Sequence, residues 1–169
     1  MNSLFKRKVI ILVFFLCLVC GCGVSKSSDK DMLKELYENP IKVNEEFEDY
    51  TYNEYSDHVT ILKYDGDEKE LNIPKQINGK LVFAIDDSSF YGNENIEKVV
   101  VPNSVVRIGY QAFIGCENLK EITLPDGIIE FGESVFDVCP NLEKINVKMD
   151  SKTDDILKKS VFKRYINYK

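Results

Sequence analysis

The residues of this chain best suited to chemistry are five cysteines and a single histidine. Thiols can form disulfides, ligate metals or act as nucleophiles, and imidazole is the commonest general base. Cys116 and Cys139 lie 23 residues apart, and His58 is distant from both in the sequence. Because a structural zinc site needs four such ligands and no Cys-x-x-Cys pair follows residue 22, we predict no metal site.

His58 is also the one candidate base for a hydrolytic triad. It follows Asp57 at the start of a segment with the alternation of a strand, and no G-x-S-x-G motif supplies a nucleophile. This placement fits a turn better than an active site. Two carboxylates could cleave a glycoside, but no pair of acids is singled out by its position. We therefore expect no catalytic residue and no cofactor, and an enzyme is the least favoured class of function.

The N-terminus has the pattern of an export signal. Three basic residues at positions 6–8 precede an apolar run over residues 9–20, shorter than the about 20 residues that span a bilayer. The run ends in V-C-G-C, which resembles the lipobox of bacterial lipoproteins. That resemblance implies removal of residues 1–21, lipidation of Cys22 and an extracytoplasmic protein held at the membrane. An ordinary cleaved signal peptide without lipid is the alternative.

The charge of the chain argues against nucleic acid as a partner. The net charge is −6, and loss of the three basic leader residues leaves −9. Phosphate binding requires clustered Lys or Arg. Residues 22–57 are predicted to be a lipid-anchored tether, with a short helix ended by Asn39-Pro40 and then an acidic segment in which Tyr50 and Tyr52 alternate as in a strand. That acidic segment, residues 41–57, is either part of the tether and cap or a partner-binding arm.

The sequence repeats itself every 23 residues between positions 85 and 148. No single 23-residue unit can bury its apolar groups alone, but stacked units place each group above its equivalent and form one continuous core. We therefore predict a solenoid of the α/β type, with a short parallel strand in each turn. The predicted core columns are Ile85, Ile108 and Phe131; Phe90, Phe113 and Phe136; Ile96, Leu119 and Leu142; Val99, Ile122 and Ile145; and Val101, Leu124 and Val147.

The second repeat identifies the kind of solenoid. Residues 108–125 follow the pattern I-G-x-x-A-F-x-x-C-x-x-L-x-x-I-x-L-P at every position, which resembles the BspA-like leucine-rich repeats of bacterial surface proteins. The other copies depart from it: Asp86 replaces the glycine and Asn93 the cysteine in the first, and Lys148 replaces the proline in the third. The resemblance implies a leucine-rich-repeat array that acts by binding proteins or in adhesion.

The ends of such an array need caps. At the start, residues 58–84 are predicted to form β-hairpins, one turning at residues 65–67 and one at Asn78-Gly79, that lead into the array. At the end, residues 149–169 are predicted to form a helical cap that begins near Thr153 and has Leu157, Val161 and Tyr165 on one face.

The strand face of the array is the candidate interaction surface. Its outward charges alternate in sign down the stack, which indicates that they pair with each other rather than form a charged pocket. Between them lie Val100, Thr123 and Asn146, a mild strip suited to recognition by shape. The two charge columns are Glu97, Lys120 and Glu143, and Lys98, Glu121 and Lys144.

Two further columns have a structural interpretation. Stacked turns would separate the Cα atoms of Cys116 and Cys139 by about 4.8 Å, but parallel Cβ vectors at that spacing exceed the usual disulfide range of roughly 3.5–4.5 Å. Buried free thiols are therefore favoured over a bridge. Asn95, Asn118 and Asn141 are expected to satisfy backbone groups at the turns.

These patterns favour a lipid-anchored surface protein that binds a protein or another cell-surface ligand. Adhesion is the role that the family resemblance implies. The alternative is an accessory lipoprotein that docks a partner within the envelope of the same cell.

Overall fold

The computed structural model describes residues 33–34, 36–37 and 39–169. The predicted leader and Cys22 lie outside these residues. Within the predicted short helix, residues 33–34 and 36–37 are helical. The chain divides into two compact units, residues 1–39 and residues 40–169, and the second contains the repeats. None of the helices in the part of the chain that the structure describes is long and apolar enough to cross a bilayer.

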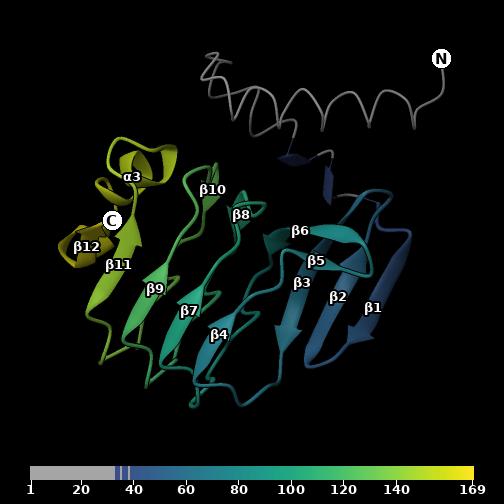
Figure 1. Cartoon of the computed structure of the whole chain (residues 1–169), viewed down its shortest axis with the longest axis horizontal. Helices are drawn as coiled ribbons and strands as arrows, with labels where there is room; N and C mark the ends of the chain where they lie inside the picture. The colour runs from purple at the N-terminus through teal and green to yellow at the C-terminus, as the bar shows by residue number, and fades with distance from the viewer. Residues whose placement is uncertain (1–32, 35, 38) are drawn as a thin grey trace. The chain divides into compact units, whose positions relative to one another are not determined.

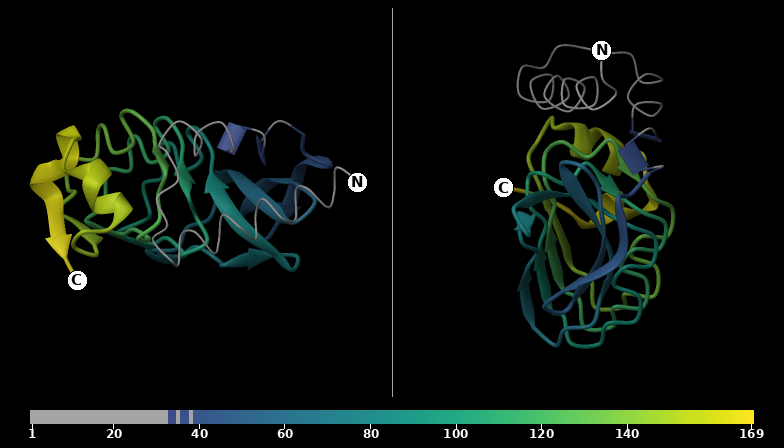
Figure 2. Two further views of the ribbon diagram at one scale, coloured as in Figure 1. Left: turned by 90° about the horizontal axis from the view of Figure 1, so that it is seen from above. Right: turned by 90° about the vertical axis from the view of Figure 1, so that its right-hand side faces the viewer.

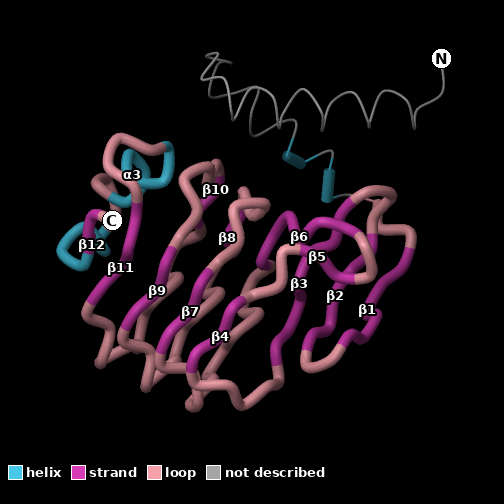
Figure 3. The backbone as a smooth tube through the Cα atoms, in the orientation of Figure 1, coloured by secondary structure: helices cyan, strands magenta, loops and turns pink. Residues whose placement is uncertain are grey.

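Residues 40–169 wind as a solenoid with a β-sheet on each of two sides (Figures 1 and 3). The first sheet contains β3 (His58–Tyr64), β6 (Lys80–Ile85), β8 (Arg107–Ile108) and β10 (Glu130–Phe131), all parallel. The second contains the parallel strands β4 (Glu70–Asn72), β7 (Lys98–Val100), β9 (Glu121–Thr123), β11 (Lys144–Val147) and β12 (Ile166–Tyr168).

Four turns contribute one strand to each sheet, and the last turn contributes β12 to the second sheet alone. The view along the stack shows a flattened coil (Figure 2, right). This confirms the predicted repeat solenoid. The second sheet has five strands, and the structure therefore has about five turns where the sequence shows three clear copies. The extra turns come from residues 58–84 and from the C-terminal residues. Their sequences depart from the repeat because each has a repeat neighbour on only one side.

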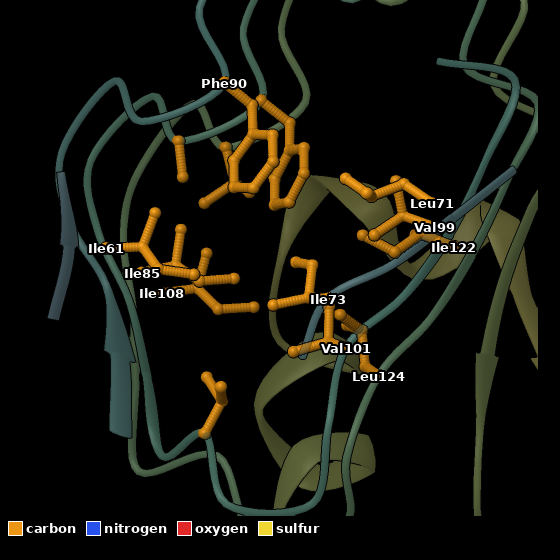
Figure 4. Packing of buried hydrophobic residues seen from close by; sticks show 14 of the residues in the cluster. Ile61, Leu71, Ile73, Ile85, Phe90, Val99, Val101, Ile108, Ile122 and Leu124 are labelled. Carbon is orange, nitrogen blue, oxygen red and sulfur yellow. The ribbon is translucent and has the colours of Figure 1, made fainter. Parts of the chain in front are cut away.

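The predicted core columns form the interior (Figure 4). Ile61, Ile85 and Ile108 are stacked by the register of the first sheet, and Leu71, Val99, Ile122 and Ile145 by that of the second. All of these side chains are buried. Since burial contributes roughly 25 cal/mol per Å² of apolar surface, stacked turns stabilise one another where single turns could not form.

An aromatic ladder continues the phenylalanine column beyond the three predicted residues. Phe90 and Phe113 are stacked with ring centroids 4.5 Å apart, and Phe113 and Phe136 are 5.8 Å apart. Tyr64 extends the ladder at one end, 5.4 Å from Phe90, and Phe162 extends it at the other, 5.3 Å from Phe136. Tyr64 of the first turn and Phe162 of the C-terminal cap thus carry the core into regions where the sequence repeat is no longer visible.

The N-terminal cap is an antiparallel hairpin. β1 (Lys42–Phe47) pairs with β2 (Tyr50–Glu54), and β2 pairs with β3. The predicted hairpin within residues 58–72 is wrong, because β3 pairs with β6 and β4 with β7, in different sheets. The Gly-bearing stretch at 65–67 makes a corner of the solenoid. The hairpin at Asn78-Gly79 is confirmed: β5 (Gln76–Ile77) pairs with β6, and both turn residues have positive φ, as a type I′ turn requires.

The C-terminal cap begins as a helix but does not continue as one. The predicted helix is confirmed over α3 (Lys152–Leu157), whose Ser151 caps the N-terminus and whose Leu157 is buried. It ends there, and Ser160 caps a separate 3₁₀ helix, η1 (Val161–Tyr165), before β12. Because of this break Val161 is 77% exposed, where a continuous helix would have buried it, and Phe162 enters the core instead.

Candidate functional site

The outer face of the second sheet carries the two predicted columns of alternating charge, each longer by one residue than expected. The first begins at Lys69, whose Nζ lies 3.0 Å from Glu97, and Glu97 accepts a second bond of 2.7 Å from Lys120. The second begins at Glu70, 2.9 Å from Lys98. With these additions the formal charges of each column sum to zero, so the face presents no net field to a charged ligand.

Glu97 is the centre of the first column. Hydrogen bonds from Lys120 and then Lys69, together with the charges of these lysines, lower the pKa of Glu97 to about 2. The carboxylate is therefore ionised over the whole physiological range. Because the ion pairs lie at the surface, they fix the register of neighbouring strands more than they stabilise the fold.

The predicted strip Val100, Thr123 and Asn146 is a single column of the second sheet. Val100 is 44% exposed and Thr123 is half-buried, but Asn146 is 7% exposed. Asn146 donates to Glu121 at 2.6 Å and accepts from Asn167 of β12 at 2.6 Å. Asn167 of β12 thus takes up the side chain of Asn146. The open part of the column runs over Thr123, Val100 and the exposed Asn72 of β4, which is the register partner of Val100.

The two cysteines and, of the three predicted asparagines, Asn118 and Asn141 have the predicted structural roles. Cys116 and Cys139 are free and buried, and their thiols donate to the carbonyls of Phe90 and Phe113 at 3.1 Å. The neighbouring thiol of Cys139 and burial raise the pKa of Cys116 above its ordinary value, which disfavours its thiolate form.

Asn118 and Asn141 donate to the carbonyls of Glu94 and Glu117 in the preceding turns, at 2.7 and 2.8 Å. In the first copy Asn93, at the position of the missing cysteine, donates to the carbonyl of Gly66 at 3.0 Å. Hydrogen bonds from these asparagine side chains therefore join successive turns at this corner of the solenoid.

His58 is a buried side chain packed between aromatic residues. Its Nδ1 is 2.9 Å from Asp57, and its ring stacks on Tyr55 at 4.5 Å and packs against Phe83 at 4.9 Å. Burial would raise the pKa of Asp57, but hydrogen bonds from His58 and Ser56 outweigh it and leave that pKa lowered. The buried Nε2 has no hydrogen-bond partner in the described residues, so no hydroxyl nucleophile is held by the ring.

Two features escaped the sequence analysis. Arg107 lies on the first sheet between three carboxylates, at 2.6 Å from Asp86, 2.9 Å from Asp87 and 3.3 Å from Glu130. In the sequence each of these carboxylates is 20 to 23 residues away from Arg107, and this spacing was the signal that could have indicated the cluster. The second feature is a cavity of about 500 Å³ between the last repeat and η1, lined among others by Phe136, Val138 and Val161. No periodicity indicates it, since one wall lies outside the repeat.

None of the sites described above has the arrangement of a catalytic site. In the described residues, no three His, Cys, Asp or Glu side chains are grouped as a metal site. What the structure does assemble is a parallel face with columns of alternating charge, and at the C-terminal end a cavity lined by apolar residues together with Asp137 and Arg164.

Comparison with known proteins identifies the class of protein. Residues 84–169, more than half of the chain, match the family described as "BspA type Leucine rich repeat region (6 copies)". The chain therefore belongs to the BspA-type leucine-rich-repeat family. No curated protein is similar enough to the chain to be matched.

Solved structures of leucine-rich-repeat proteins are similar to the chain. One from Bacteroides capillosus ATCC 29799 is 25% identical with a TM-score of 0.60, over 78% of this chain and 99% of that one. Another from Bacteroides ovatus ATCC 8483 is 24% identical with a TM-score of 0.55, over 62% of this chain and 29% of that one. A leucine rich cell surface protein from Faecalibacterium prausnitzii A2-165 is 22% identical with a TM-score of 0.48, over 72% of this chain and 38% of that one.

Proposed function

We propose that this chain is a bacterial surface lipoprotein, anchored through Cys22, whose leucine-rich-repeat module binds a protein partner and catalyses no reaction. The observation that carries the binding role is the open strip of Asn72, Val100 and Thr123 between two columns of alternating charge. Repeat modules of this family are typical of binding and surface proteins. The export signal and the V-C-G-C sequence support the anchor.

The chemistry of the strip defines the kind of partner it suits. Glu97 and Lys98 are held in ion pairs and the formal charges of each column sum to zero, so long-range charge does not select the ligand. Val100, 44% exposed, offers an apolar contact, while Asn72 and Thr123 offer amide and hydroxyl groups. A flat, neutral protein surface of matching shape fits this face. The contact is small compared with a stable interface, which buries about 800 Å² on each partner.

A short array favours a partner that is already held nearby. Long repeat arrays gain area and avidity, and this array has about five turns. A partner in the same envelope is concentrated by the shared membrane, which makes the accessory role the second candidate beside adhesion to another cell or a host.

Crosslinking on living cells, followed by mass spectrometry, tests the binding role. Wild type is compared with Val100→Glu, which places a charge on the strip, and with Met149→Glu, a matched control at an exposed apolar residue outside the strip. Loss of a crosslinked partner in the first variant alone supports the proposal. Equal crosslinking in all three proteins excludes this face. The source of the captured protein, same cell or host matrix, decides between the two roles.

The anchor is tested separately by Cys22→Ser. Without the thiol no lipid can be attached, so the protein should move from the membrane fraction to the medium or another soluble fraction. Cys20→Ser is the matched control, because it removes the neighbouring thiol and leaves the proposed lipidation site intact. An unchanged membrane fraction for Cys22→Ser would reject the lipoprotein assignment.

A further inference from the structure

A strained residue marks the last turn of the array. Positions 92, 115 and 138 are equivalent in the 23-residue repeat, and all three have positive φ, at 65°, 72° and 57°. The first two are glycines, for which this conformation is free of strain. The third is Val138, and a β-branched residue with positive φ is unusual. Its side chain is 68% exposed, so burial does not offset the strain. Strain without a folding benefit points to a function.

Val138 borders the cavity of about 500 Å³. Phe136, Cys139 and Phe162 also line it and are buried, whereas Val161 on the opposite wall is 77% exposed. The cavity therefore has a floor that belongs to the protein core and an edge formed by two exposed branched side chains. Apolar lining of this size accepts one or two apolar side chains of a partner.

The wall formed by η1 is positively charged. Arg164 lines the cavity and is held over the ring of Tyr165, with its guanidinium carbon 4.7 Å from the ring centroid. Arg164, Lys159 and Lys163 have no carboxylate within ion-pair distance in the part of the chain that the structure describes. Asp137 is the one acid among the lining residues. An occupant with apolar side chains surrounded by carboxylates complements this site.

The opposite end of the same molecule has exposed apolar side chains and acids in one hairpin, where Lys42 lies between the apolar residues and is paired with Glu45 and Glu54. On the edge hairpin, Ile41 is 60% exposed and Val43 58% exposed. Glu46, Glu48 and Asp49 follow in the same hairpin, are exposed, and make no ion pair among the described residues. β1 and β10 are the two edges of the first sheet, and the hairpin lies at the opposite end of the row of strands from β10, β11 and the C-terminal cap (Figure 1; Figure 2, left). The cavity belongs to that far end, because residues 136–140 and η1 line it.

We propose that the cavity at Val138 and Val161 receives the β1 edge of a second copy of this chain, so that copies associate head to tail. The apolar side chains of Ile41 and Val43 would enter between Val138 and Val161, and the acids of the hairpin would face Arg164 and its neighbouring lysines. The contact joins unlike surfaces, so each copy keeps one free end of each kind and the association continues along the solenoid axis. It requires neither the lipid nor the strip at Val100.

Sedimentation velocity on residues 23–169 tests the proposal. This length contains the whole compact unit of residues 40–169, with its core and both caps, and circular dichroism checks the fold of each variant. Wild type should form larger species as its concentration is raised in the micromolar to millimolar range. Raising ionic strength from about 0.1 to 1 M, which shortens the Debye length from about 10 to 3 Å, should weaken the association.

Variants at the two ends provide the decisive experiment. Val161→Asp blocks the cavity of a copy and leaves its hairpin intact, whereas Val43→Lys blocks the hairpin and leaves the cavity. Each variant alone should remain a monomer, and an equimolar mixture should form a dimer that does not grow further. Val138→Gly removes an apolar side chain from the edge of the cavity and also relieves the backbone strain at this position. The variant should therefore stay folded and associate more weakly. Met149→Asp, at an exposed apolar residue that does not line the cavity, should associate as wild type does.

A wild-type protein that stays monomeric throughout this concentration range would overturn the proposal. So would unchanged association of Val161→Asp, or a mixture that behaves as the sum of two monomers. Crosslinking of the cavity to a different protein on living cells, with no self-association, would assign the same surface to that partner instead. Since the lipid and the strand strip are absent from these tests or unaltered in them, their outcome is independent of the proposed function.

Discussion

The middle turn of the array, residues 108–124, and its last turn, residues 131–147, are built on the same 23-residue plan but in different surroundings. In the middle turn Ile108, the equivalent of Phe131, is fully buried and the tight corner is a glycine, Gly115. In the last turn Phe131 is only partly buried and the corner is Val138. Repeat residues are therefore specified by the neighbouring turn on each side, and they diverge where one neighbour is a cap.

The largest expected difference between these regions is the cost of truncating the aromatic ladder. Phe113 has aromatic neighbours on both sides, so Phe113→Ala should lower the free energy of unfolding by about 3–5 kcal/mol. Phe162→Ala, at the end of the ladder and 6% exposed, should cost less because the cap can relax into the space. Urea unfolding of both variants measures the difference. Equal losses would show that the cap is packed as rigidly as the middle of the array.

The same comparison explains how much of the fold the sequence could predict. The core columns, the short strands and the free thiols follow from residues with an equivalent 23 positions away, and the structure confirms them. The pairing of β3 with β6 could not be predicted in this way, because residues 58–84 have only weak similarity to the repeat and their Gly-bearing stretch at 65–67 is also typical of a hairpin. Local signals of turns do not tell which sheet the next strand enters.

The candidate sites divide along the same boundary. The repeats predict the alternating charge columns, but among the described residues only Glu97 and Lys120 of those six charges form an ion pair with each other. Lys69 and Glu70, one turn earlier and 28 residues from Glu97 and Lys98, form the other ion pairs of the columns and were missed. The cavity was not predictable, since it depends on the break at Ser160 that turns Phe162 inward and leaves Val161 exposed. The apolar spacing of Leu157, Val161 and Tyr165 predicts one continuous helix, but the serine cap and the packing of the core override it.

Exchanging the corner residues of the two turns should have opposite effects on stability. Val138→Gly removes the strain of the αL conformation, which costs a non-glycine residue about 1–3 kcal/mol. The gain is reduced because the unfolded chain with an added glycine has more conformational entropy, which costs roughly 0.5–1 kcal/mol on folding. We expect a net gain of about 1 kcal/mol. Gly115→Val, at φ of 72°, should instead destabilise by about 1–2 kcal/mol. Thermal and urea unfolding measure both. A loss of stability in Val138→Gly would mean that the valine has a packing role in the monomer.

The smallest expected effect concerns the surface charges that the middle turn shares with its neighbours. Hydrogen bonds from Lys120 and Lys69 lower the pKa of Glu97 from the ordinary value of 4.5 to about 2. A lowered pKa in the folded state means that the ion pairs stabilise the fold fully above the unfolded pKa, and that this contribution is lost as the pH falls from about 4.5 to about 2.

Carboxyl NMR titration of Glu97 should therefore give a midpoint near 2, and Glu97→Gln should flatten the loss of stability between pH 4.5 and 2. Glu143 is the matched control, because it occupies the same column in the last repeat but has no ion-pair partner among the described residues, so Glu143→Gln removes a carboxylate without breaking an ion pair. A Glu97 midpoint near 4.5 would show that the lysines are solvated rather than bound. The paired charges would then not fix the register of the strands, and the strand face would depend on its buried columns alone.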